Sequence, residues 1–122
     1  MITSFGIQGP WFFVTENASL TSPFGAAKFV VENNLIGMHV EQGASAIISG
    51  EMNVKNNAIA GIKADNASGL TFLSVPANAS TILYNGTDMI LGFGTKSTID
   101  GVTVGTIGCD GTVLSGGTKV CP

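Results

Sequence analysis

One unit of sequence occurs twice within residues 33–68, and this repeat restricts the possible folds more than any other feature. In both copies two asparagines precede an apolar run with a glycine, and an acidic residue and a small polar turn follow. Asn57 lies 23 residues after Asn34, and Gly61 lies 24 residues after Gly37. Such a period is typical of a solenoid, in which each unit buries its apolar residues against its neighbours.

Further segments extend this repeat. Residues 15–20, 41–46 and 65–70 each combine an acidic residue, a small polar turn and a returning apolar residue. Short runs rich in β-forming residues follow, and none keeps the 3.6-residue period of a long helix. We therefore predict an all-β chain that folds as a right-handed parallel β-helix of about four to five coils, capped at both ends.

The chain of 122 residues suits a single domain, so we place one β-helix over residues 1–122. Residues 1–13 are rich in aromatic side chains and predict an N-terminal cap, or alternatively an exposed platform for sugar stacking. The coils are expected over residues 14–107 and a C-terminal cap over residues 108–122. A proline within residues 74–80 predicts a protruding loop, because it cannot donate a hydrogen bond to a strand ladder.

The asparagines have a physical reason in such a fold. Sharp bends between faces need a positive φ, which Gly accepts freely and Asn accepts better than most residues. In a stack, Asn side chains of successive coils can also hydrogen-bond along the axis, as in cross-β assemblies. We expect Asn34, Asn57 and Asn85 to form a ladder of this kind.

The two cysteines, Cys109 and Cys121, both lie in a terminal segment rich in Gly and Thr and are expected to be structural. A disulfide between them would close a loop of about 13 residues and contribute roughly 3 kcal/mol in the chain-entropy model. It would also imply an oxidising compartment. The alternative is a pair of free buried thiols.

Composition limits the partners. With 44% apolar and 11% charged residues, the chain is too hydrophobic for intrinsic disorder. Its net charge of −3 argues against binding nucleic acid, which depends on Lys and Arg that neutralise phosphates. No apolar run approaches the roughly 18 residues of a membrane-spanning helix. The first residues lack the pattern of a secretory signal.

The repeated pattern of two asparagines, isoleucine, glycine, a β-rich run, an acid and Ala-Ser runs through about residues 14–105. It resembles the right-handed parallel β-helix of the pectin-lyase-like superfamily. That group includes polysaccharide lyases, polygalacturonases, phage tailspikes and long bacterial surface proteins. Most members are far longer, so this chain resembles the C-terminal end of one or a minimal version.

The enzymatic branches of that group are not matched. Its lyases imply an Arg or Lys base beside calcium-binding carboxylates, whereas this chain has no Arg and no close pair of acids. Its polygalacturonases imply Asn-x-Asp, Asp-Asp and His-Gly motifs, and none occurs. We therefore predict no catalytic residues, no cofactor and no metal site.

A predicted binding set remains. Coils stacked at about 4.8 Å would bring Glu16, Glu41 and Asp65 together as an acidic stripe. Three alternative roles for this acidic stripe are catalysis, weak cation binding and a solvated edge without a ligand. His39, the only histidine, aligns with Lys63 in the repeat and is expected at an exposed position of the same face.

We predict a non-enzymatic module of an extracellular or cell-surface protein, with a structural, adhesive or carbohydrate-binding role. Carbohydrate is the favoured ligand because this fold presents long grooves lined by polar side chains. The alternative is a fragment of a polysaccharide lyase or glycoside hydrolase. A short β-helix leaves open ladder edges, so self-association or a larger parent chain is also expected.

Overall fold

The computed structural model describes the backbone of residues 2–5, 10–21, 27–74, 79–92, 94–109 and 114–117. Side chains are described for residues 15–21, 28–74, 79–92 and 94–109. Within these ranges the regular structure is entirely β-strand, and no helix is long and apolar enough to cross a membrane. The strands are β1 (Ile2–Phe5), β2 (Pro10–Val14), β3 (Ser19–Thr21), β4 (Ala27–Glu32), β5 (Ile36–Val40), β6 (Ser45–Lys55), β7 (Ala60–Ala64), β8 (Gly69–Ser74), β9 (Ser80–Leu83), β10 (Thr87–Leu91), β11 (Lys96–Asp100), β12 (Val102–Val104), β13 (Ile107–Cys109) and β14 (Leu114–Gly117).

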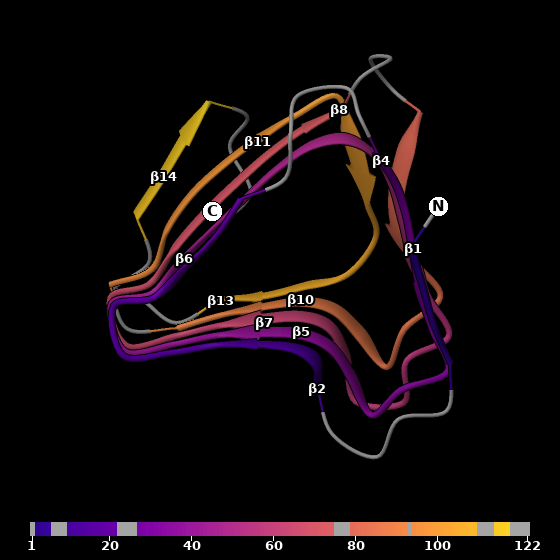
Figure 1. Ribbon diagram of the computed structural model, residues 1–122, viewed down its shortest axis with the longest axis horizontal. Helices are drawn as coiled ribbons and strands as arrows, with labels where there is room; N and C mark the ends of the chain where they lie inside the picture. The colour runs from indigo at the N-terminus through magenta and orange to yellow at the C-terminus, as the bar shows by residue number, and fades with distance from the viewer. Residues whose placement is uncertain are drawn as a thin grey trace.

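Successive strands stack in parallel along three sides of a triangle (Figure 1). The first face is the sheet β13-β10-β7-β5-β2. A nine-stranded sheet wraps the other two sides because β6 belongs to both. The first half of β6 lies on the second face, where it pairs with β3 and β8, and β11 and β14 continue this face. The second half of β6 lies on the third face, where it pairs with β4 and β9, and β1 and β12 continue that face.

The predicted β-solenoid is therefore confirmed, but it has about three turns rather than four to five. Each turn needs a strand on all three faces, and neighbouring turns are offset by 24 residues at Ile36 and Ala60. Three turns lie between the end segments, namely β5–β6, β7–β8–β9 and β10–β11–β12, and of their residues only 75–78 and 93 are not described. Strands β1 to β4 and β13 to β14 belong to turns that include undescribed residues.

Apolar side chains fill the centre of the triangle. Along β6 the inward positions Ala46, Ile48, Met52 and Val54 are all buried, whereas Ile47 between them is exposed. This alternation follows from the two-residue period of a strand, and each turn adds its inward side chains to those of its neighbours. Burial of apolar surface at roughly 25 cal/mol per Å² is the main term that stabilises the stack.

Strand β6 turns the corner between two faces of the triangle. Gly50 lies in the middle of β6 with φ of 139°, and the strand continues from the second face to the third without a break. Glycine accepts this backbone conformation because it has no Cβ.

Tight turns connect the first face to the second, and they stack along the axis. Two successive residues with positive φ occur in three of them: Glu16 and Asn17, Gln42 and Gly43, Asn66 and Ala67. In one turn the Ala44 N–H donates to the Glu41 carbonyl at 3.1 Å, as in a two-residue turn with both φ values positive. Ser45 pairs with Gly69 in the next turn, which confirms the predicted phase of the repeat.

The predicted asparagine ladder is also confirmed. The Asn34 N–H donates to Asn57 Oδ1 at 3.1 Å, and the Asn57 N–H donates to Asn85 Oδ1 at 3.0 Å. Asp88 ends the ladder, because its Oδ1 accepts from the Asn85 N–H and its Oδ2 from the Thr106 N–H. Burial raises the pKa of Asp88, but these hydrogen bonds outweigh that effect and lower the pKa below its ordinary value of 3.8.

Several sequence predictions fall partly outside the described residues. Residues 75–78 of the predicted loop are not described. Of residues 1–13, β1 and β2 continue two sheets through pairing with β4 and β5. Cys109 is disulfide-bonded, and Cys121, the only other cysteine, lies outside the described part.

Candidate functional site

Polar side chains gather on the outer surface of the first face, where its strands run into the tight turns. His39 pairs with Lys63 across β5 and β7, as the repeat predicted. Both side chains point outward because their neighbours in sequence, such as Met38 and Val40, are buried in the core. Asp65 follows β7 directly.

Three of the predicted binding residues, His39, Glu41 and Asp65, form a compact group that we call the His39 cluster. His39 Nε2 lies 3.5 Å from Glu41 Oε2 and 3.7 Å from Asp65 Oδ2. One ring nitrogen of His39 and one carboxylate oxygen from each of Glu41 and Asp65 all lie within 4.8 Å of one another. The exposed fractions of the side chains are 14% for His39, 19% for Glu41 and 22% for Asp65.

His39 lies on the predicted outward face, next to Lys63, but its side chain is half-buried rather than exposed. The imidazole lies on the outer surface of the sheet, but the carboxylates of Glu41 and Asp65 approach its Nε2 from two turns. Asp65 Oδ1 is itself buried and accepts no hydrogen bond from the described residues. Two carboxylates so close together favour a cation between them, since like charges destabilise each other.

Glu16 does not join these acids, which corrects the predicted acidic stripe. The strand register pairs Val14 with Val40, so Thr15 and not Glu16 lies beside Glu41. Thr15 Oγ1 lies 3.4 Å from Glu41 Oε1. Glu16 instead occupies an exposed turn position with φ of 54°.

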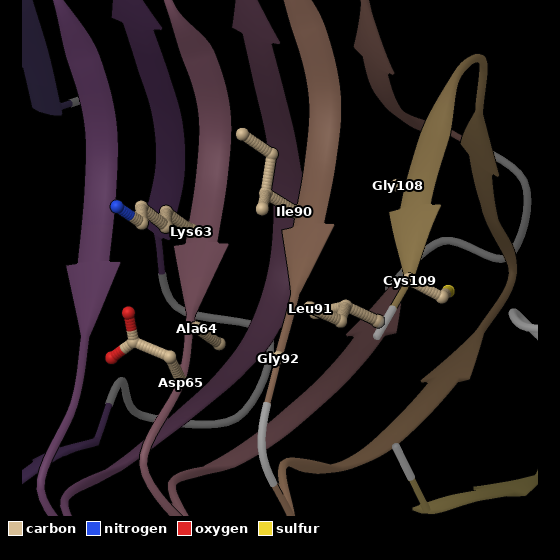
Figure 2. Close-up of a pocket in the computed structure, with 8 residues that line it drawn as sticks. All are labelled: Lys63, Ala64, Asp65, Ile90, Leu91, Gly92, Gly108 and Cys109. Atoms are coloured by element: carbon tan, nitrogen blue, oxygen red, sulfur yellow. The ribbon is translucent and has the colours of Figure 1, made fainter. Parts of the chain in front are cut away.

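Beside the cluster lies a pocket of about 400 Å³, which we call the hollow (Figure 2). Outward side chains become smaller along this row of the sheet, from Lys63 through Ile90 to Gly108. In the next row Asp65 is followed by Gly92, which adds no side chain. The hollow is lined by Lys63, Ala64, Asp65, Ile90, Leu91, Gly92, Gly108 and Cys109.

Sequence reasoning did not find the hollow. The sequence feature that marks it is the pair Gly92 and Gly108, which have no side chain where the adjacent turn carries Asp65 or Ile90. Figure 2 shows Lys63 on one strand with Asp65 just past its end, Cys109 on another strand, and Ile90 on the strand between them. The site therefore offers an ammonium and a carboxylate at one edge and an apolar surface beside them.

A smaller groove of about 270 Å³ lies on the second face. Gly69 leaves room between Ser45 and Lys96, which are its partners in the neighbouring turns. Ile47, with 39% of its surface exposed, forms the apolar part of this groove. It lacks the clustered carboxylates of the first face, so the hollow is the better candidate for ligand binding.

The strand pairing and this site together define a parallel β-solenoid with a charged pocket on its first face. Comparison with protein-family models, curated proteins and solved structures finds no match. The class is therefore assigned from the structure itself.

Proposed function

We propose that the chain is a non-enzymatic binding module that holds a carbohydrate in the hollow of its first face. The observation that carries this proposal is the combination of an apolar surface, formed by Ile90 and Gly108, with the charged edge of Lys63 and Asp65. Ligand pockets typically pair a mostly apolar lining with a few placed polar groups.

A sugar ring suits both parts of this lining. Its C–H face can pack on Ile90 and on the bare backbone of Gly92 and Gly108, and its hydroxyls can donate to the Asp65 carboxylate. Lys63 provides a donor for a hydroxyl or for the carboxylate of an acidic sugar. A pocket of about 400 Å³ matches one or two sugar units, since ligand pockets measure roughly 300–1,000 Å³.

The proposal includes an extracellular or cell-surface location and a right-handed solenoid related to the pectin-lyase-like proteins. The disulfide at Cys109 supports the location, because disulfides persist in oxidising compartments. Handedness is supported by the rule that connections between parallel strands of a sheet are right-handed in about 98% of cases.

The test fills the hollow without disturbing the fold. A Cβ added at Gly108 would approach only Thr87 Cγ2, at 4.0 Å, so Gly108→Val projects into open space. Gly69→Ala on the second face is the matched control, because its nearest neighbours lie at 3.8 and 3.9 Å. In affinity electrophoresis against neutral and acidic polysaccharides, we expect retardation of the wild type and Gly69→Ala, and at least tenfold weaker binding by Gly108→Val.

Two results would contradict the proposal. Equal retardation of Gly108→Val and the wild type would place the ligand elsewhere, and no retardation by any polysaccharide would remove the carbohydrate role. Polysaccharide cleavage that is lost in Glu41→Ala or Asp65→Ala would instead favour the enzymatic alternative, in which the two carboxylates act as an acid and base pair.

A further inference from the structure

We propose that the His39 cluster binds one divalent transition-metal ion of the Zn²⁺ class. The inference goes beyond carbohydrate binding and does not depend on it. It starts from the convergence of an imidazole nitrogen and two carboxylates, from Glu41 and Asp65, within 4.8 Å of one another.

The geometry leaves room for an ion. Three atoms separated by at most 4.8 Å have a common point no farther than about 2.8 Å from each of them, and Zn²⁺ binds nitrogen and oxygen at roughly 2.0–2.2 Å. A side-chain movement of less than about 1 Å therefore completes the coordination. At 3.5 and 3.7 Å, the distances from His39 Nε2 to the carboxylates exceed those of good hydrogen bonds and suit two ligands of one ion.

A buried acceptor without a partner points to the same site. Asp65 Oδ1 has almost no contact with solvent and accepts no hydrogen bond from the described residues. A buried carboxylate oxygen in that state costs free energy unless a donor or a metal satisfies it. A metal ion held by Asp65 would compensate this cost, through either oxygen of the carboxylate.

The ligand types select the metal. Ca²⁺ and Mg²⁺ prefer oxygen ligands, so the central imidazole of His39 argues against both. One nitrogen and two carboxylate oxygens suit Zn²⁺, which commonly binds three protein ligands and leaves a fourth position for water. The partial exposure of Glu41 and Asp65, 19% and 22%, gives the ion and this water access.

The local structure preorganises these ligands. His39 is fixed in the sheet by the pairing of β5 with β7, and Glu41 begins a turn closed by the Ala44 N–H. The Asp65 N–H donates to the Val40 carbonyl at 3.0 Å, which joins the two turns. Lys63 lies beside His39 in the sheet, and its single positive charge reduces but does not cancel the charge of the two carboxylates.

The experiment is a calorimetric titration of the full chain, free of any polyhistidine tag, with ZnCl₂ and no saccharide. We expect one Zn²⁺ per chain for the wild type. His39→Gln and Asp65→Asn should bind at least tenfold more weakly. Glu16→Gln, which removes an acid of the adjacent turn outside the cluster, should bind as the wild type does.

Circular dichroism of each variant checks that it remains folded, and Ca²⁺ at the same concentration should not compete. Undiminished binding by both His39→Gln and Asp65→Asn would overturn the proposal, as would the absence of binding by the wild type at millimolar Zn²⁺. Gly108→Val should still bind Zn²⁺, so failure of the carbohydrate proposal and failure of the metal proposal give different results.

Discussion

Tyr84 adopts a backbone conformation that its side chain does not favour. Its φ is 63°, and it occupies the same row as Asn33 and Asn56, with φ of 60° and 56°. The left-handed region suits Asn far better than an aromatic residue. The Tyr84 side chain gains little in return, because 78% of the residue is exposed.

We therefore expect Tyr84→Asn to stabilise the protein by about 0.5–1 kcal/mol, because the substitution relieves backbone strain and loses little buried surface. Urea unfolding of the variant and the wild type measures this difference. Asn56→Tyr is the reverse change in the adjacent turn and should destabilise by a similar amount. Lower stability of Tyr84→Asn would show that the tyrosine side chain makes contacts worth more than the strain.

Asp88 should make the stability of the protein sensitive to acid. Because its pKa is lower in the folded chain than its ordinary value of 3.8, the folded state favours the carboxylate. Its contribution to the free energy of unfolding is thus fully present above pH 4 and is lost as the pH falls through the folded pKa. Asp88→Asn should lower the free energy of unfolding by about 1–3 kcal/mol at pH 7, because the four hydrogen bonds that Asp88 accepts lose their charged acceptor.

Urea titrations at pH 7 and pH 3 test this, with Asp100→Asn as the control because Asp100 is an exposed acid on β11. The difference between wild type and Asp88→Asn should shrink at pH 3, whereas Asp100→Asn should change little at either pH. A difference that stays constant with pH would assign the effect of Asp88 to packing.

At the scale of the element, glycine positions differ sharply in what they tolerate. A Cβ on Gly37 would lie 2.5 Å from the Gly61 carbonyl oxygen of the adjacent turn, which is a clash with backbone. A Cβ on Gly69 would lie at ordinary contact distances of 3.8 and 3.9 Å. The ladder residue Asn57 crowds Gly37 further, with Nδ2 at 3.2 Å from the added atom.

Gly37→Ala should therefore destabilise by roughly 1–3 kcal/mol, because neighbouring turns must separate. Gly69→Ala should be neutral or stabilise by up to about 1 kcal/mol, since Ala restricts the unfolded chain. Thermal unfolding of both variants compares them directly. Equal melting temperatures would show that the turns can move apart at little cost.

Whatever repeats in the sequence could be predicted, because stacking places equivalent residues side by side. Asn34 and Asn57, 23 residues apart, gave the ladder, and the phase of the tight turns followed from the same spacing. Residues one position out of phase with the repeat were misplaced. Glu16 is displaced by one position from the acids that follow, and one residue decides which row a side chain enters.

The number of turns and the hollow could not be predicted from the sequence for a related reason. Gly50 allows β6 to continue round a corner as one strand on two faces, and the strands at both ends belong to turns with undescribed residues, so short runs of sequence do not count turns directly. The hollow depends on three turns at once, since Lys63, Ile90 and Gly108 become neighbours only after stacking. The His39 cluster was partly predictable, because the repeat aligned His39 with Lys63 and Glu41 with Asp65.

At the scale of the whole molecule, a stack of parallel strands has ladder edges at both ends. Among the described strands, β12 pairs only with β9, and Thr103 at its centre is exposed. An edge of this kind can pair with another chain through its free backbone groups. The prediction that the module associates with itself or belongs to a larger parent chain can be tested at this edge.

If β12 is such an edge, sedimentation of the wild type should show concentration-dependent association, and Thr103→Lys should shift the chain toward the monomer, because a charged side chain on an edge strand opposes pairing. Thr71→Lys is the matched control, since Thr71 lies on β8, which has strands on both sides. A wild type that remains monomeric at high concentration would contradict self-association. Equal effects of the two lysines would trace any change to net charge, because only Thr103 lies on the open edge.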